Sequence, residues 1–254
     1  MIEASELKNA AEIKGLSVKN CEKDYLLELF LYLLYKETGK DLVFKGGTAL
    51  YKIYSLNRFS EDLDFTLNSN KIKLEELLNK VIRKLRDINI NAKVKNIDDY
   101  KNQKNIKIEL RGPLFDGSLG SLSLITINSS LKERTINKPE QKMIFSKYAD
   151  IISFDVFSMP LDEIFAEKVR AIMTRDKPRD VYDLWFLLKK GVNINLKNIN
   201  IKLKLYNKKF EERIFFDKIY EKEKMWERDL NGLIIGDLPK FRIVVKYIKQ
   251  FFES

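Results

Sequence analysis

Histidine is absent from this sequence, and cysteine occurs only once, at Cys21. Without histidine the chain has no serine–histidine triad, no histidine general base and none of the commonest zinc ligands. A single thiol can form neither an intramolecular disulfide nor a cysteine-rich zinc site. Any chemistry that the chain performs must therefore depend on carboxylates, lysines and hydroxyls.

Long apolar runs are also missing. The longest, from Tyr25 to Tyr35, contains Glu28 and is shorter than the roughly 20 residues that a membrane-spanning helix needs. The N-terminal residues lack the apolar segment that follows a basic start in a secretory signal. The apolar share of 44% and the charged share of 33% are typical of a globular protein. We therefore expect a cytoplasmic protein with no membrane partner.

Positive charge is in excess. Lysine and arginine number 47 against 37 aspartates and glutamates, which gives a formal net charge of +10. Cationic side chains favour polyanionic partners, because neutralising phosphates releases bound counterions. Nucleic acid is the natural candidate. A lysine-rich coding bias of the genome would give the same composition, and composition alone does not separate the two explanations.

The hydrophobic pattern predicts an α+β fold. Apolar residues between Leu74 and Ile88 recur at helical spacing, whereas the residues from Ile106 to Arg111 alternate between apolar and polar as in a strand. Residues 95–105 between them are polar and predict a loop. Strands are predicted at 41–44, 59–67, 106–111, 119–127 and 151–157, and helices at 24–36, 49–55 and 74–88.

The pattern changes near Ser158. From Met159 onward the apolar spacing is almost wholly helical, and no internal repeat is visible. This change predicts two domains, a mixed α/β domain at 1–157 and a C-terminal helical domain at 158–254.

Two aspartates predict a metal site. Asp62 and Asp64 stand two residues apart in a predicted strand, so both carboxylates point to one face. Neighbouring negative charges repel unless a cation bridges them, and such oxygen ligands suit Mg²⁺ or Mn²⁺. Glu109, on the polar face of another predicted strand, is the candidate third ligand. The alternatives are a solvated acidic strand edge and, for Glu109, a cross-strand charge pair beside Lys107 and Arg111.

The segment Lys45-Gly46-Gly47-Thr48 separates a predicted strand from a predicted helix. Glycines let backbone N–H groups approach an anion, and a helix N-terminus adds partial positive charge. Thr48 supplies a hydroxyl that could bind phosphate or cap the helix. A glycine pair alone is equally consistent with an ordinary turn. Together with the aspartates, it provides the phosphate site and the metal site that a nucleoside triphosphate requires.

The helical part contains an inward-facing lysine. Lys168 lies four residues after Ile164 and four before Ile172, so it shares their buried face. A buried ammonium group needs an anion, either a carboxylate such as Asp183 or a bound triphosphate. A purely structural ion pair between two helices is the alternative. Arg179, in the loop between the predicted helices, is a candidate phosphate contact or part of a solvated basic surface.

Three segments, in this order, resemble the motifs of the AbiEii/AbiGii family of toxin nucleotidyltransferases. They are Lys-Gly-Gly-Thr-Ala-Leu from Lys45, Arg-Phe-Ser-Glu-Asp-Leu-Asp-Phe from Arg58, and Glu-Lys at 167–168 followed by Arg-Asp-Val-Tyr-Asp-Leu from Arg179. The likeness extends from about residue 44 to residue 188. It implies a polymerase-β-like nucleotidyltransferase domain, with a mixed sheet and flanking helices, followed by a C-terminal helical subdomain.

The resemblance also assigns roles to residues. It implies that Asp62 and Asp64 hold the metal and that Lys168 and Asp183 are the later essential lysine and aspartate. Thr48 replaces the commoner serine and keeps its hydroxyl. The segment between Thr48 and Asp62 is longer than in minimal nucleotidyltransferases. The implied nucleotide-binding residues are Lys45, Gly46, Gly47, Thr48, Arg58, Ser60 and Arg179.

The expected function is metal-dependent transfer of a nucleoside monophosphate from an NTP to RNA, in characterised relatives the 3′ end of tRNA. The resemblance implies the toxin of a toxin–antitoxin or abortive-infection system. The expected cofactor is Mg²⁺ or Mn²⁺, and the expected partners are the NTP, an RNA and a cognate antitoxin. Two alternatives stay open. The same site could modify a protein hydroxyl, or the chain could be a non-catalytic nucleic-acid-binding module, which would not require the paired aspartates.

Overall fold

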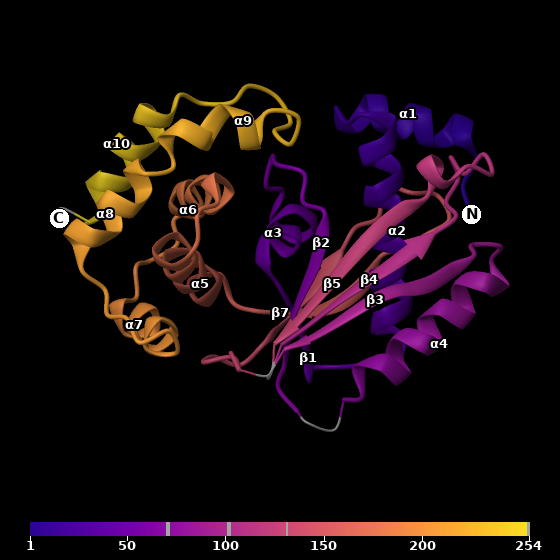
Figure 1. Cartoon of the computed structure of the whole chain (residues 1–254), viewed down its shortest axis with the longest axis horizontal. Coiled ribbons are helices and arrows are strands. Elements are labelled where there is room, and N and C mark those ends of the chain that lie inside the picture. The colour runs from indigo at the N-terminus through magenta and orange to yellow at the C-terminus, as the bar shows by residue number, and fades with distance from the viewer. Residues whose placement is uncertain (70–71, 101–102, 131, 253–254) are drawn as a thin grey trace. The chain divides into compact units, whose positions relative to one another are not determined.

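The computed structural model describes residues 1–69, 72–100, 103–130 and 132–252. They fall into two compact units, which Figure 1 shows as mainly indigo to magenta and mainly orange to yellow segments. The sheet unit comprises Met1–Ser55, Phe59–Arg134 and Pro139–Ser158. The helical unit comprises Leu56–Arg58, Thr135–Lys138 and Met159–Ser254.

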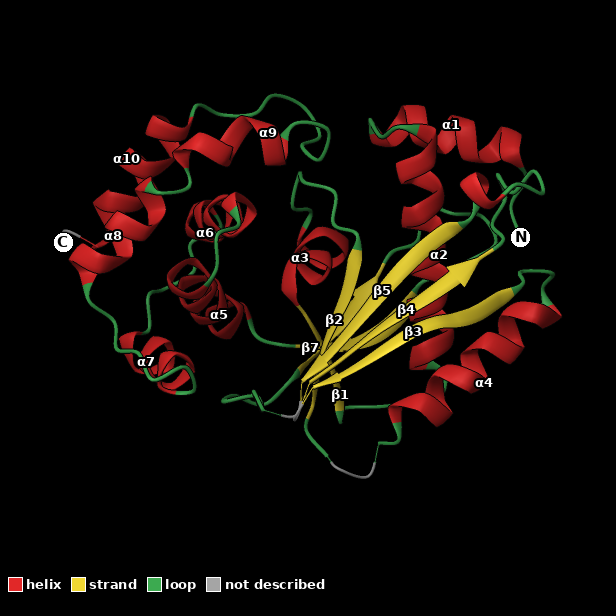
Figure 2. Ribbon diagram, in the orientation of Figure 1, coloured by secondary structure: helices red, strands yellow, loops and turns green. Residues whose placement is uncertain are grey.

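The sheet unit is built on a seven-stranded mixed sheet (Figure 2). Its strands are β1 (Leu42–Lys45), β2 (Asp62–Leu67), β3 (Ala92–Tyr100), β4 (Gln103–Leu110), β5 (Ser123–Ser130), β6 (Glu140–Ile144) and β7 (Phe154–Ser158). Their order across the sheet is β3-β4-β5-β2-β1-β7-β6. The central strand β2 runs antiparallel to β1 and parallel to β5. The mixed sheet confirms the expected fold class.

One face of this sheet carries the core. Leu63 and Phe65 of β2 are fully buried in a cluster with the apolar residues of the long helices, while Asp62 and Asp64 alternate with them toward the other face. The sheet unit's helices are α1 (Ala4–Lys14), α2 (Val18–Tyr35), α3 (Gly46–Tyr54) and α4 (Leu74–Asp87). Ser17 caps α2 by accepting a hydrogen bond from the Asn20 backbone N–H at 3.2 Å.

Two strands differ from the prediction. The expected polar loop at 95–105 is instead the hairpin of β3 and β4, apart from residues 101–102, which lie outside the described residues. Strand β3 is at the sheet edge, is largely exposed and contains a register shift between Val94 and Asn96. A half-buried strand is recognised by the alternation of apolar and polar residues. An exposed, irregular edge strand lacks this alternation and was therefore not predicted. Strand β6, at the opposite edge, is also mostly exposed and was not predicted.

The helical unit follows the expected pattern from Met159 onward. Its helices are α5 (Leu161–Thr174), α6 (Pro178–Lys189), α7 (Leu196–Lys204), α8 (Glu212–Tyr220), α9 (Trp226–Leu230) and α10 (Phe241–Phe252). Pro178 occupies the first turn of α6, where no intrahelical N–H bond is lost. Every helix in the described ranges is too short or too polar to span a membrane.

Two short upstream segments also belong to the helical unit. The Asn57 side chain accepts a hydrogen bond from the Tyr182 hydroxyl at 2.8 Å, and its carbonyl accepts one from the Ile235 N–H at 2.9 Å. The Glu163 carboxylate accepts from the backbone N–H groups of Ile136 and Asn137 at 2.9 and 3.0 Å. These hydrogen bonds join residues that are far apart in the chain. The periodic pattern of the sequence therefore could not predict that the two segments belong to the helical unit.

A buried ionic cluster ties α3 to α2. Lys52 of α3 lies 2.7 Å from Asp24 Oδ1 and 2.6 Å from Glu28 Oε2, and Lys14 of α1 lies 2.6 Å from Asp24 Oδ2. The Tyr148 hydroxyl donates to Asp24 at 2.6 Å. Burial opposes ionisation of Asp24, but the ammonium groups of Lys52 and Lys14 outweigh it and lower its pKa to about 2.

We expect Asp24→Asn to lower the free energy of unfolding at pH 7 by about 2 kcal/mol. The pKa of Asp24 is lower in the folded than in the unfolded chain, so its contribution is present above about pH 4 and is lost as the pH falls toward 2. Urea unfolding should therefore show a deficit that shrinks between pH 5 and pH 2. Asp87→Asn, at the exposed end of α4, is the control. A deficit for Asp24→Asn that does not change with pH would contradict this explanation.

Candidate functional site

Asp62 and Asp64 occupy the first and third positions of β2. Both are half-buried, and strand alternation directs both away from the core residues Leu63 and Phe65. On the neighbouring strand β5, Thr126 lies level with Asp62 and Asn128 lies level with Asp64. The two carboxylates therefore share one polar face of the sheet.

The glycine segment lies directly against this face. Helix α3 begins at Gly46, and the preceding residue, Lys45, is level with Asp64 in the β1–β2 pairing. A Cβ atom on Gly46 would lie 2.3 Å from Asp64 Oδ2, and the φ of Gly46 is +75°. Only glycine allows both this approach and this backbone conformation. The structure thus brings together the N-terminus of α3 and the carboxylate of Asp64.

The side chains of the glycine segment have internal partners. Thr48 is fully buried, and its hydroxyl donates a hydrogen bond to the Asp62 carbonyl. The hydroxyl thereby fixes the first turn of α3 to the start of β2, and its contact with a phosphate stays a prediction. Lys45 is also buried, with its Nζ 3.4 Å from Glu133 Oε2. Gly46 is half-buried, whereas Gly47 beside it is buried.

Glu109 is not brought together with the aspartates. On β4 the residue level with Thr126 is Lys107, and Glu109 lies further along, opposite Leu124. Its carboxylate is 3.0 Å from Lys93 Nζ and 3.5 Å from Lys95 Nζ, and the hydrogen bond from Lys93 lowers its pKa. Among the residues that the structure describes, no three aspartate, glutamate, histidine or cysteine side chains form a metal-binding group. The expected third ligand is therefore a cross-strand charge pair, with partners on β3.

The helical unit contains the predicted Lys168–Asp183 pair. Lys168 Nζ lies 2.6 Å from Asp183 Oδ2, and Asp183 accepts two hydrogen bonds from the Arg58 guanidinium, both at 2.9 Å. Burial of Asp183 favours its neutral form, but Arg58 and Lys168 outweigh this effect and lower its pKa. Arg58 is only 1% exposed. Its guanidinium thus makes a buried two-point contact with Asp183, and its contact with a nucleotide stays a prediction.

Asp180 is a second partner of Lys168 that sequence reasoning missed. It is fully buried, 3.0 Å from Lys168 Nζ, and it accepts a hydrogen bond from Arg175 Nε at 2.7 Å. Asp180 and Asp183 are three residues apart on α6, a spacing that places both on one helix face and that was visible in the sequence. The two carboxylates thus pair with the ammonium group of Lys168 without a ligand. The alternative of a purely structural ion pair between two helices requires such an arrangement.

The remaining predicted residues divide between the two units. Ser60, in the sheet unit, is 9% exposed and lies just before β2. Arg179 is half-buried in the first turn of α6, in the helical unit. The predicted site residues therefore form two groups, one around Asp64 and Gly46 and one around Asp183.

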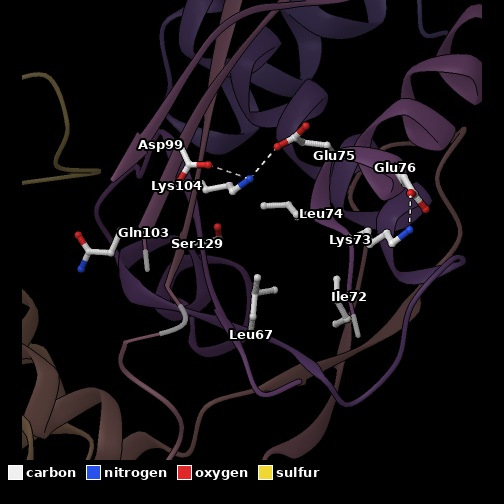
Figure 3. Close-up of a pocket in the computed structure, with 10 residues that line it drawn as sticks. All are labelled: Leu67, Ile72, Lys73, Leu74, Glu75, Glu76, Asp99, Gln103, Lys104 and Ser129. Carbon is white, nitrogen blue, oxygen red and sulfur yellow. Dashed lines mark hydrogen bonds and ion pairs between the residues drawn. The ribbon is translucent and has the colours of Figure 1, made fainter. Parts of the chain in front are cut away.

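A cavity of about 410 Å³ lies at the other end of β2 (Figure 3). Leu67, the last residue of β2, lines it together with Ile72 and Leu74. Lys104 on its wall forms ion pairs with Glu75 at 2.7 Å and Asp99 at 3.0 Å. The lining includes neither Asp62 nor Asp64, so this cavity is separate from the aspartate pair.

Comparisons with known proteins agree with this fold. The fold is similar to that of MenT4, a nucleotidyltransferase toxin from Mycobacterium tuberculosis H37Rv, with a TM-score of 0.70 and 16% identity over 99% of this chain and 89% of that chain. It is also similar to JHP933 from Helicobacter pylori, with a TM-score of 0.55 and 18% identity over 94% of this chain and 95% of that chain. No curated protein matches the sequence. The family model described as the nucleotidyl transferase AbiEii toxin of the type IV toxin–antitoxin system matches residues 30–250. The chain therefore belongs to the AbiEii family of nucleotidyltransferase toxins.

Proposed function

We propose that this toxin transfers a nucleoside monophosphate from an NTP to RNA, with the 3′ end of tRNA as the acceptor, in a reaction that requires Mg²⁺ or Mn²⁺. The observation that carries the proposal is the position of Asp64, which shares a sheet face with Asp62 and lies against Gly46 at the N-terminus of α3. The net charge of +10 favours a polyanionic acceptor. Membership of a type IV toxin–antitoxin family supports a cognate antitoxin as protein partner.

The donor groups fit a divalent cation. Asp62 and Asp64 offer carboxylate oxygens on one face, and such hard ligands suit Mg²⁺ and Mn²⁺. A bound divalent ion would lower the pKa of the attacking hydroxyl and neutralise charge on the departing pyrophosphate. The free N–H groups that begin any helix, together with the helix dipole, favour a phosphate at the start of α3.

The proposed reaction is a single displacement at phosphorus. The oxygen of an RNA hydroxyl forms a bond to the α-phosphorus, and the bond between this phosphorus and the bridging oxygen of the β-phosphate breaks. Pyrophosphate leaves with the electron pair, and one of the two aspartates accepts the hydroxyl proton. The role of the sheet unit is to hold Asp62 and Asp64 in place, since orientation of the reacting groups accounts for much of the barrier reduction in such reactions.

We also propose that Lys168 stabilises negative charge on the phosphates and that Asp183 orients it. Two observations support this role. The ammonium of Lys168 is fixed by Asp183 and Asp180, so its position is predetermined. Arg58, the other partner of Asp183, precedes Asp62 by only four positions in the chain. The structural alternative assigns the same contacts to stability alone, and substitution of Lys168 separates the two.

The direct test of the function is an assay with Mg²⁺, total RNA and each labelled NTP. We expect label on RNA with wild type, and about 1000-fold less with Asp62→Asn or Asp64→Asn, because a metal ion contributes several kcal/mol of charge stabilisation. Glu109→Gln, on the same sheet face, should transfer at close to the wild-type rate. Label on a protein in place of RNA would redirect the proposal to a protein acceptor, and full transfer by Asp64→Asn would refute it.

Gly46→Ala should impair transfer far more than stability. The new methyl group would collide with Asp64 Oδ2, and alanine at positive φ costs roughly 1–2 kcal/mol. We expect a modest decrease in melting temperature and a loss of transfer comparable to that of Asp64→Asn. Gly39→Ala is the matched control, because a Cβ there meets nothing within 4 Å. Transfer by Gly46→Ala at the Gly39→Ala rate would show that the Asp64–Gly46 contact is dispensable.

Lys168→Met removes the charge while keeping a long, unbranched side chain. If Lys168 stabilises phosphate charge, transfer per folded molecule should fall by about 100-fold, the usual cost of losing one such group. The folded state should be destabilised as well, because Asp180 and Asp183 lose a shared partner. Lys202→Met, which removes another buried lysine paired with Glu163 and Glu167, is the matched control for stability. Destabilisation of both variants with transfer unchanged would leave Lys168 a structural role only.

A further inference from the structure

A second hydrogen bond fixes the carboxylate of Asp64 from the side of β5. The two strands run parallel, and Asn128 lies level with Asp64 in their register. Asn128 Nδ2 donates to Asp64 Oδ1 at 2.9 Å. The other carboxylate oxygen, Oδ2, is the atom that lies against Gly46. The two oxygens of Asp64 thus have different neighbours, and Oδ1 is held by a hydrogen bond.

Asn128 is in turn held by the next strand. Asn105 of β4 lies level with Asn128, and its Nδ2 donates to Asn128 Oδ1 at 2.6 Å. The three side chains therefore form a row across β4, β5 and β2. A carboxylate only accepts hydrogen bonds, so the amide nitrogen of Asn128 must face Asp64 and its oxygen must face Asn105. The charge on Asp64 therefore sets the direction of the whole row.

This direction leaves one polar atom without a partner. Asn105 Oδ1 is buried and accepts no hydrogen bond from any described residue. An unsatisfied buried acceptor costs roughly 1–3 kcal/mol. A pair selected only to stabilise the sheet would gain more from a satisfied or apolar residue at position 105, since asparagine is also disfavoured in strands. The row is better explained by its effect on Asp64.

We propose that Asn128 is a positioning residue that fixes the carboxylate of Asp64 for metal binding, and that Asn105 acts through Asn128 by orienting its amide. The inference depends on the proposed function, in which Asp64 is a metal ligand. Hydrogen bonds to ligating carboxylates hold them in the geometry that the metal requires, and their loss typically weakens metal binding by about 10- to 100-fold. Neither asparagine was singled out by the sequence motifs.

The test measures Mn²⁺ binding directly, by the loss of the free-ion signal in electron paramagnetic resonance. We expect Asn128→Ala and Asn128→Leu to weaken binding by about 10- to 100-fold, the leucine variant keeping the side-chain volume in case alanine disturbs the fold. Asn105→Ala should weaken binding less. Asn96→Ala is the matched control, because Asn96 also donates from a strand to a carboxylate, that of Asp98 at 2.8 Å, away from Asp64.

The Mn²⁺ affinity of the double variant Asn105→Ala/Asn128→Ala distinguishes an effect of Asn105 through Asn128 from a general structural effect. If Asn105 acts only through Asn128, the double variant should bind Mn²⁺ as weakly as Asn128→Ala alone, whereas independent effects would multiply. Binding by Asn128→Ala and Asn128→Leu at wild-type strength, with Asp64→Asn still defective, would overturn this inference and leave the proposed function standing. Equal binding by wild type and Asp64→Asn would overturn the proposed metal site, and this inference with it.

Discussion

The close approach of the Gly46 backbone to the Asp64 carboxylate is the constraint on which the candidate site of the sheet unit depends. It requires a residue without a side chain at the start of α3, at positive φ, and an acidic residue on β2 level with the preceding residue, Lys45. A negative charge beside a helix N-terminus is favoured by the helix dipole, which compensates part of the cost of placing two aspartates on one sheet face. A cation bound by these aspartates would compensate the remainder.

Contacts of helix α3 and of Asp64 hold the Gly46 backbone and the Asp64 carboxylate close together. Thr48 joins the first turn of α3 to the start of β2, and Lys52, further along the helix, is anchored by Asp24 and Glu28 of α2. From the other side, Asn128 holds the second oxygen of Asp64. The side chain of Asp64 is therefore restrained before any ligand binds, and restraint of this kind lowers the entropic cost of forming a metal site.

Local pattern was sufficient to predict much of the molecule. The spacing of Asp62 and Asp64, the glycine break and the inward position of Lys168 each follow from residues close together in the chain, and the AbiEii family is confirmed. The position of Glu109 could not be predicted, because it depends on the strand register. In the observed register Glu109 lies two residues along β4 from Lys107, the residue level with Thr126, and so lies away from the aspartates. The residues that were missed, Asn128, Asn105 and Asp180, act through contacts that only the folded chain creates, although the spacing of Asp180 and Asp183 was visible.

Anomalous diffraction from crystals grown with Mn²⁺ and a non-hydrolysable NTP analogue tests the central claim most directly, because it locates the ion without reference to activity. The account predicts anomalous density in contact with the carboxylates of Asp62 and Asp64, with the phosphates of the analogue at the start of α3 beside Gly46. Density at other carboxylates, with none between Asp62 and Asp64, would contradict it.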